Sequence, residues 1–551
     1  MFFSSRVFLS SLTLFLLFLS HFTYSKPQSD ALNKAPAPGF LYGLPLDRPL
    51  TLRQAFPAAL ENEYHFLTHS PKASSFIYPR LSIYPFLDSN HGIGHPSSDS
   101  ILPHPNNKLT LKGVKFSDQL YLPTGIFGYH KILSQDNGFL ALYPVLGIES
   151  RGEALEGVFA EKTNRVPTQA FDIGLQTYGS RGPFGFFLDG RIFTEIRDTL
   201  LPDRRAFDRE FLETQNKDNS GSLDYTSYAR YRSIFSLRTS IGDFLLGHDS
   251  PHWGPGLFTN LSFHQGSIPF DYVQYSTRLG PFRVASLYGR LQLDHSARFQ
   301  KSSDFRSLYA HRYEWMPFDK LTIGISEQLV FFNHEEPWAF APLVPLFMHK
   351  GLNKESFNNG NIAFDFSYKI IEFIRVYSEF LIDDLQAPSS LFNDYWGNRW
   401  AWMCGAHIAW LHQPQMWGGS IVEYSRIEPY VYMHYDSLTA QSANAGYPLG
   451  NQFGPNSQAI ILKHYLRLYE KFYFSLKTDF IWKGKGYGSN LVESIYATPE
   501  LESSPKKFID GINRPNIEQT VGLAWKNNFL SIQGSLIFGD FLTWNLRFQF
   551  N

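Results

Sequence analysis

Residues 361–370 read NIAFDFSYKI, and their side chains alternate between two chemical classes. Phe364 and Phe366 belong to an apolar set, whereas Asp365 and Lys369 belong to the small or polar set between them. A period of two residues predicts a β-strand with one apolar and one polar face. This stretch therefore predicts an all-β fold.

The same alternation recurs toward the C-terminus. It covers residues 472–482, 530–538 and 542–550, with short polar turns at 526–528 and 539–540. Tight turns between strands of this length are typical of antiparallel hairpins in barrels. Residues 321–331 follow the pattern too, except that Glu327 interrupts the apolar face.

A soluble β-sandwich also alternates apolar and polar residues, so the orientation of the two faces decides the class. Here one face carries bulky Phe, Trp and Leu, and the other carries Arg, Lys and Asp, as in a barrel with lipid outside and a polar interior. We therefore expect an outward-facing set and an inward-facing set: Phe366, Phe474 and Trp544 outside, and Asp365, Lys477 and Arg547 inside.

Composition excludes several other classes. Aromatic residues make up 17% and charged residues 18% of the chain, with a formal net charge of -1, so no electrostatic footprint for nucleic acid exists. The single cysteine, Cys404, forms neither an internal disulfide nor a cysteine-rich zinc site. After Lys26 no apolar run is long enough for a spanning helix, which leaves a closed barrel as the way to cross a membrane.

The first 25 residues predict a cleavable signal peptide. Arg6 supplies the positive charge, residues 7–19 are mostly apolar, and Thr23 and Ser25 place small residues before a cleavage site at Lys26. Export to the bacterial outer membrane follows from this reading together with the barrel.

The chain divides into three predicted parts. Residues 1–25 are the signal peptide, 26–109 a small helical or irregular periplasmic plug region, and 110–551 a closed antiparallel transmembrane β-barrel. At 20 to 25 residues for each strand and connection, the barrel has about 18 strands, with even numbers from 16 to 20 all compatible. Long polar stretches at 199–222, 435–457 and 483–515 predict outside loops.

Two partners follow from the barrel itself. Outer-membrane lipid would contact the apolar face. The final aromatic strand looks like the C-terminal signal that outer-membrane assembly machinery reads, although Asn551 follows Phe550.

No catalytic or cofactor motif is present in the sequence. It has no phosphate-binding glycine loop, no His-Glu-x-x-His and no nucleophile elbow. His91, His95 and His104 lie in a loop-like region where a solvated loop is favoured over a metal site. We predict no cofactor, no metal and no enzymatic activity.

Three stretches are unusual for plain strands and supply the candidate ligand-binding residues. Glu379 and Asp383 share a strand face roughly 13 Å apart, whereas glycosidase carboxylates need about 5 to 9.5 Å. The opposed charges could equally form a network inside the lumen. The candidates are Asp249, His252 and Trp253 in 247–256, Glu379, Asp383 and Asp384 in 377–384, and Glu423, Tyr424, Arg426 and Glu428 in 423–429.

These stretches carry a family resemblance. HDSPHWGPG with the following LFTNLSF and PFDYVQY, then YSEFLIDD, then EYSRIEPY with the downstream GPNS, resemble the capsule assembly Wzi family over about residues 230 to 460. The resemblance implies an outer-membrane barrel of about 18 strands with a helical plug. It also implies a surface role in holding or organising capsular-type polysaccharide. A solute channel, or a barrel-embedded hydrolase using Glu379, Asp383 or Glu423, remains open as an alternative.

Overall fold

The computed structural model describes most of the chain from residue 138 onward. The described residues are 138–151, 168–181, 184–198, 223–239, 241–264, 267–293, 304–318, 320–342, 344–346, 348, 358–371, 373–385, 391–413, 416–434, 440–468, 472–484, 486–489, 491, 506–509, 515–526, 530–538 and 542–550. The predicted signal peptide, the predicted plug region and the three histidines near residue 100 lie outside them.

Nearly all regular structure within these residues is β-strand, which confirms the all-β prediction. The strands are β1 Gly138–Arg151, β2 Thr168–Arg181, β3 Phe184–Asp198, β4 Leu223–Thr239, β5 Gly242–Asp249, β6 Phe270–Leu279, β7 Phe282–Leu291, β8 Arg306–Phe318, β9 Leu321–Phe332, β10 Asn358–Ile371, β11 Ile374–Asp384, β12 Arg399–Gln413, β13 Met416–Ile427, β14 Ala443–Asn444, β15 Tyr447–Pro448, β16 Ser457–Leu468, β17 Phe472–Lys483, β18 Asn516–Lys526, β19 Leu530–Phe538 and β20 Leu542–Phe550. One short 3-10 helix, η5, spans Pro337–Phe340. No helix among the described residues is long and apolar enough to cross a membrane.

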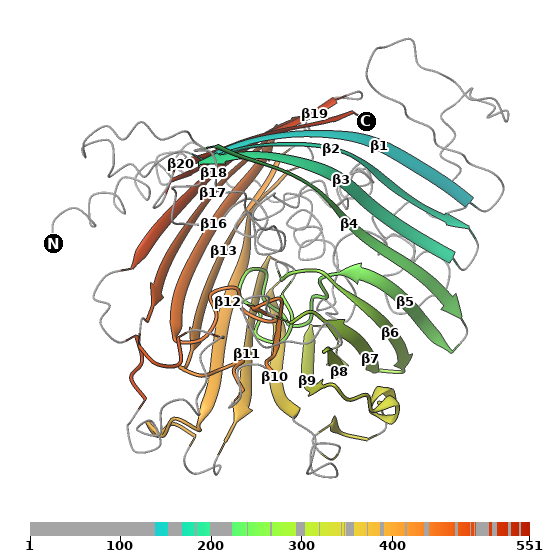
Figure 1. Ribbon diagram of the computed structural model, residues 1–551, viewed down its shortest axis with the longest axis vertical. Helices are drawn as coiled ribbons and strands as arrows, with labels where there is room; N and C mark the ends of the chain where they lie inside the picture. Colours follow the sequence, from blue (N-terminus) through green and yellow to red (C-terminus); the bar gives the residue numbers. More distant parts are fainter. Residues whose placement is uncertain are drawn as a thin grey trace.

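Sequence neighbours pair throughout the large sheet, always in the antiparallel sense. Eighteen of the described strands belong to this sheet, and β14 pairs with β15 in a separate small hairpin. β1 pairs with β2 on one side and with β20 on the other, so the first strand also bonds to the last (Figure 1). The strands predicted at 321–331, 361–370, 472–482 and 530–538 are confirmed as β9, β10, β17 and β19.

Short turns and long connections alternate along the chain from β1 to β19. β4–β5, β6–β7 and β8–β9 are joined by turns of a few residues, whereas the connections after β5, β7 and β9 are long. Because adjacent strands run antiparallel, these short turns lie at one end of the sheet and the long connections lie at the other end, where the short turn between β19 and β20 also lies. We call these the short-turn end and the long-loop end.

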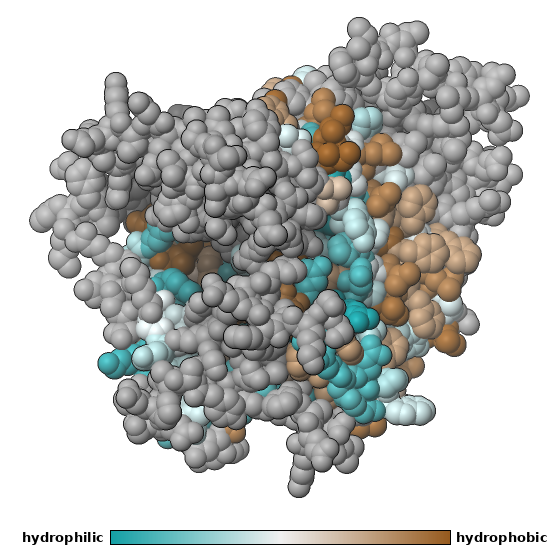
Figure 2. All heavy atoms as spheres, viewed as in Figure 1, coloured by the Kyte–Doolittle hydropathy of each residue, from teal (hydrophilic) through white to brown (hydrophobic). Residues whose placement is uncertain are grey.

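The two faces of the strands are oriented as the sequence predicts. Phe366 and Phe474 are 42% and 40% exposed, whereas Asp365 and Lys477 are 4% and 2% exposed. The side chains of Trp544 and Arg547 lie outside the described set. Figure 2 shows hydrophobic residues gathered along the flank formed by β1–β7, beside hydrophilic residues nearer the middle. Exposed rings beside buried charges are the reverse of a water-soluble fold and are typical of a membrane barrel.

Buried charges on the inner face are bonded to one another. Arg191 of β3 bonds Asp189 at 2.8 Å and Asp172 of β2 at 3.3 Å. Lys477 bonds Asp479 two positions along β17. Such pairing is required because an isolated buried charge is very unfavourable. The interior is therefore polar but occupied by its own side chains in these sectors.

Candidate functional site

The connection between β5 and β6 lies inside the ring of strands rather than outside it. Every residue from 250 to 264 is buried, and we call this segment the inner loop. Trp253 forms an isolated bridge with Phe263, and their rings meet edge to face at 5.1 Å. Asn260 Nδ2 lies 3.0 Å from His252 Nε2, and this contact joins the beginning of the inner loop to its later part. The sequence marked 247–256 as unusual for a plain strand, and the structure shows that the segment after β5 is folded inward.

Glu423 of β13 binds the first half of the inner loop. Its carboxylate accepts hydrogen bonds from the backbone N–H of Leu257 at 2.5 Å and of Phe258 at 3.0 Å, and from Thr259 Oγ1 at 2.7 Å. Tyr377 of β11 donates its hydroxyl to the same carboxylate at 2.7 Å. The four donors of the protein therefore occupy the hydrogen-bonding positions of the Glu423 carboxylate oxygens.

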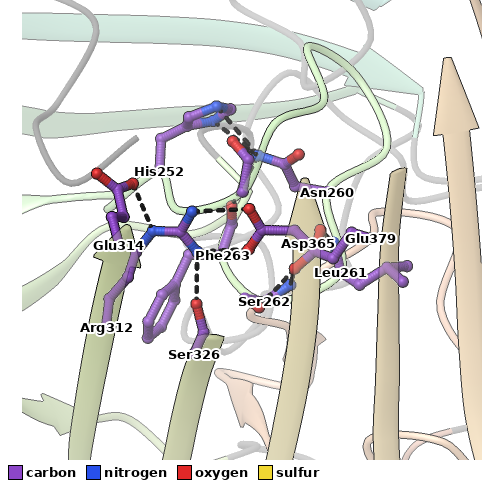
Figure 3. A network of polar contacts seen from close by, with 11 residues as sticks. His252, Asn260, Leu261, Ser262, Phe263, Arg312, Glu314, Ser326, Asp365 and Glu379 are labelled. Carbon is purple, nitrogen blue, oxygen red and sulfur yellow. Dashed lines mark hydrogen bonds and ion pairs between the residues drawn. The ribbon is translucent and has the colours of Figure 1, made fainter. Parts of the chain in front are cut away.

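Glu379 of β11 binds the second half in the same way. It accepts the backbone N–H of Leu261 at 2.7 Å and of Ser262 at 3.0 Å, together with Ser262 Oγ at 2.6 Å (Figure 3). Gly254 passes close by with φ +113°, and a Cβ there would lie 2.8 Å from Glu379 Oε2. Glycine is therefore required for both its conformation and its lack of a side chain. Two carboxylates from the wall thus hold an otherwise irregular backbone.

An ion-paired cluster lies beside the inner loop. Arg312 of β8 donates from Nη1 and Nη2 to Asp365 of β10 at 2.7 and 2.9 Å, in a bidentate arrangement. Its Nε bonds Glu314 at 2.9 Å, and Nη1 also reaches Ser326 at 2.7 Å (Figure 3). A Cβ on Gly324 would lie 2.5 Å from the guanidinium, so glycine leaves the room that the pair occupies.

A second segment from the long-loop end also packs inward against the inner loop. Tyr432, after β13, donates its hydroxyl to the Leu261 carbonyl at 2.9 Å, and its N–H bonds Asp383 at 2.9 Å. Burial raises the pKa of the Tyr432 hydroxyl, so it remains a hydrogen-bond donor. Asn451 Nδ2 donates to the Thr259 carbonyl at 3.1 Å. The sequence predicted outside loops at 435–457, whereas the described part from 440 onward is largely buried.

A partly exposed cluster faces the other way, at the outer edge of the long-loop end. Arg426 Nε bonds Glu428 at 2.8 Å, and Lys506 Nζ bonds the same carboxylate at 3.0 Å. The Arg426 guanidinium lies 3.9 Å from the ring centre of Phe508 and 5.4 Å from that of Trp400. These five residues are the rim cluster, and the exposed ring of Phe392 packs edge to face on Trp400 at 5.5 Å.

The ten predicted site residues therefore fall into two groups. Asp249, His252, Trp253, Glu379, Asp383 and Glu423 are buried and bonded within the protein, Asp249 through Arg232 of β4. Asp384, Tyr424, Arg426 and Glu428 lie at the outer edge, where Asp384 accepts the N–H of Leu385 and Tyr424 packs on Trp402. Within this second group Glu428 is itself buried, and it is paired with Arg426 and Lys506. Glu379 and Asp383 do share one face of β11, as predicted.

Sequence reasoning missed several residues of this site. Tyr377, Arg312, Tyr432 and Asn451 were not singled out, although each contacts the inner loop or the charges beside it. Asp365 was noted only as part of a polar face. No group of His, Cys, Asp and Glu among the described residues could hold a metal ion.

The region that contains the inner loop is similar in sequence to a known protein family. The sequence model of the family described as capsule assembly protein Wzi matches residues 231–502. Residues 231–502 therefore resemble the Wzi capsule assembly family. The matched range contains the inner loop together with Glu379, Glu423 and most of the rim cluster, and the predicted resemblance is thereby confirmed. No curated protein matches the sequence.

Solved structures with a similar course of the chain include three outer-membrane proteins or porins. One is described as Wzi, an outer membrane protein involved in group 1 capsule assembly in Escherichia coli and a carbohydrate-binding β-barrel. It is 12% identical with a TM-score of 0.46, over 74% of this chain and 83% of that one. The outer membrane protein opdK from Pseudomonas aeruginosa is 10% identical with a TM-score of 0.38, over 75% and 98%. A BenF-like porin from Pseudomonas fluorescens is 9% identical with a TM-score of 0.37, over 75% and 97%.

Proposed function

We propose that this chain is an outer-membrane β-barrel that binds or organises capsular-type polysaccharide at its long-loop end without breaking bonds. The observation that carries the proposal is the match of residues 231–502 to the Wzi capsule assembly family. That range contains the whole inner loop and most of the rim cluster, so both features lie in the part of the chain that resembles the family.

The finer architecture belongs to the same proposal. The pairing of β1 with β20 supports a closed barrel of eighteen strands, and the outward apolar face supports contact with outer-membrane lipid. Residues 1–25 would be removed on export, residues 26–109 would form the periplasmic plug region, and assembly machinery would insert the barrel. The long-loop end would face outside, as long loops do in bacterial barrels.

The contacts of the buried carboxylates support a non-enzymatic role. Glu379 and Glu423 both accept hydrogen bonds from the inner loop backbone, whereas a general acid or base must reach a bound substrate. We propose that these two residues, with Asp249, His252, Trp253 and Asp383, hold the inner segments in place. The glycan would contact the outer-edge group, in which rings of the rim cluster lie beside Arg426 and Lys506.

The experiment that tests the function measures where polysaccharide resides. Deleting the gene in a capsulated source strain should move polysaccharide from the cell-bound to the released fraction, and restoring the chain should reverse the change. Unchanged retention, combined with no glycan binding by the purified protein, would contradict the proposal.

A sharper prediction concerns the rim cluster. Replacing Trp400 by Ala should weaken glycan binding by the purified protein about tenfold, corresponding to about 1.4 kcal/mol, because the ring over which Arg426 and Lys506 lie is lost. Arg426→Ala should weaken it similarly. Binding is measured by titration with capsular polysaccharide from the same strain. Phe282→Ala is the matched control, because Phe282 is an exposed ring at the short-turn end. Equal affinity of Trp400→Ala and the control would remove the rim cluster from the account.

A further inference from the structure

The outer wall of the barrel changes character along three neighbouring strands. Near the short-turn end, Phe282 of β7, Trp315 of β8 and Ile325 of β9 are exposed and apolar. Two positions closer to the long-loop end on β9, the apolar face is interrupted by Glu327, and His311 lies directly opposite it on β8. The sequence marked this interruption, and neither the inner loop nor the rim cluster explains it.

Glu327 points out of the barrel, not into it. Its neighbours Ser326 and Gln328 are the inward residues, since Ser326 bonds Arg312 and Gln328 Nε2 donates to the Ser262 carbonyl of the inner loop. Side chains alternate along a strand, so Glu327 faces the side on which Ile325 is exposed. A carboxylate on the lipid side of a barrel is unfavourable unless something covers it.

The covering element is the connection after β9, which contains η5. We call residues 333–348 the strap, of which 343 and 347 lie outside the described residues. The strap lies over the outer wall of β7 and β8, where η5 contacts both strands (Figure 1). Ser286, Tyr309 and His311 face outward and are nevertheless fully buried beneath it.

Five side chains of the wall bind the strap backbone, and we call them the seat. The first, Ser307 of β8, donates its hydroxyl to the carbonyl of His334. Tyr309 accepts the N–H of Glu336 at 3.1 Å, Ser286 donates to the carbonyl of Phe340, Tyr313 donates to the carbonyl of Pro342 at 3.3 Å, and Glu327 accepts the N–H of Leu346 at 3.0 Å. The outward-facing polar residues on this part of the wall are therefore explained by their hydrogen bonds to the strap backbone.

The need for a seat indicates what lies on the other side of the strap. In water, the backbone groups of an irregular segment are satisfied by solvent, whereas in hydrocarbon each must find a partner within the protein. The strap reduces that requirement further with Pro337, Pro342 and Pro345, which carry no N–H. The strap backbone thus has few N–H donors, and side chains of the wall bond several of its N–H and carbonyl groups. These are the properties expected of a segment that lies between protein and lipid.

The outward side of the strap continues the apolar wall. Trp338 is 78% exposed, and Val344 and Met348 are also exposed. Its polar groups gather at the start, where Glu335 accepts the Tyr288 hydroxyl at 2.9 Å and His334 lies 3.6 Å from Glu336. A tryptophan between a polar and an apolar stretch is the residue that membrane proteins place at the bilayer interface.

We propose that the strap is a membrane-docking element whose Trp338, Val344 and Met348 insert among the acyl chains of the outer leaflet. The seat holds the strap against β7–β9, so that this sector of the barrel meets lipid through the strap and not through its strands. This inference rests on the proposed membrane barrel, and it adds a lipid-binding surface to it.

Spin labelling with a reference site on each side tests the proposal. In a Cys404→Ser background, single cysteines replace Trp338, Phe366 on the wall, and Phe392, which is 75% exposed at the long-loop end. Nitroxide-labelled protein in phospholipid vesicles is then exposed to oxygen, which partitions into lipid, and to a water-soluble nickel chelate. We expect the label at 338 to favour oxygen, as at 366, while the label at 392 favours nickel.

Each other outcome overturns the proposal in a distinguishable way. A nickel-accessible label at 338 with an oxygen-accessible label at 366 removes the strap from the membrane but leaves the barrel in it. Nickel access at both removes the membrane barrel as well. Shielding from both reagents with spin–spin broadening would show that a second copy of the chain covers the strap.

The seat is tested separately by mobility. Combining Ser286→Ala with Tyr313→Phe removes two hydroxyl donors to the strap while keeping the rings and the fold of the wall. In the spectrum of the label at 338, the fraction of the mobile component should increase several-fold. The spectrum of the label at 366 should not change. Phe282→Ala is the matched wall variant. An unchanged spectrum at 338 would show that the seat does not hold the strap.

Discussion

Replacing Glu379 and Glu423 together by alanine is expected to release the inner loop from the barrel interior. Glu423 satisfies four donors and Glu379 satisfies three. Left buried without partners, each donor would cost about 1–3 kcal/mol. The loop is therefore expected to leave the interior and hydrate, because that avoids the cost.

Release is measured by labelling a cysteine at Phe258, which is buried in the inner loop. In a Cys404→Ser background, a water-soluble maleimide should leave this cysteine almost unreacted in the parent and label most of it in the double variant. Planar-bilayer conductance should rise in parallel, from little current to frequent openings. A conducting parent would instead favour the solute-channel alternative.

The matched control for this experiment is Asp384→Ala. Asp384 lies on the same strand as Glu379, but it is exposed and accepts the N–H of the next residue. Labelling at 258 should stay low in this variant. If the double variant also stayed unlabelled, the inner loop would not depend on its carboxylate anchors, and the account of the buried group would fail.

Replacing Arg312 by Met is expected to destabilise the barrel strongly. The change leaves Asp365 and Glu314 as buried like charges without their common partner, and breaking such a pair typically costs about 3–5 kcal/mol. Stability is measured as the temperature at which the compact band of unheated protein converts to the unfolded band on a detergent gel.

Two further variants separate charge from packing. Adding Asp365→Asn and Glu314→Gln to Arg312→Met removes the buried charges, so much of the lost stability should return. Lys320→Met, in the exposed β8–β9 turn, should have little effect. A triple variant as unstable as the single one would show that guanidinium packing, and not charge pairing, decides the stability here.

The strands were predictable from sequence because their signal is local. The alternation around Phe366 and Phe474 gave both the strand and the side that faces outward, and Glu327 was visible as a break in it. A period of two needs only neighbouring residues, so no partner strand has to be known.

The inner loop was not predictable because its partners are distant. Glu423 binds the N–H of Leu257 across 166 sequence positions, and Glu379 binds that of Leu261 across 118. Backbone N–H groups carry no sequence signature, so both carboxylates stood out as unusual without revealing what they bind. The bidentate pair of Arg312 and Asp365 likewise requires the registers of three strands.

The strap illustrates the same limit from the other direction. Glu327 broke the apolar pattern, and the break could not be assigned because the strap contacts it through the N–H of Leu346. Pro337, Pro342 and Pro345 are visible in the sequence, but prolines indicate only that a regular strand is interrupted and not where the segment packs. Its position over β7 and β8 follows from tertiary structure alone.

The central claim is that the apolar side of the strands faces lipid and the charged side faces an enclosed interior. It is tested most directly by fluorescence quenching at adjacent positions of β17. In a Cys404→Ser background, a fluorophore on Phe474→Cys or on its inward neighbour Ser475→Cys is placed in vesicles of brominated phospholipid. The account predicts strong quenching at 474 and weak quenching at 475. Strong quenching at 475 with none at 474 would contradict it.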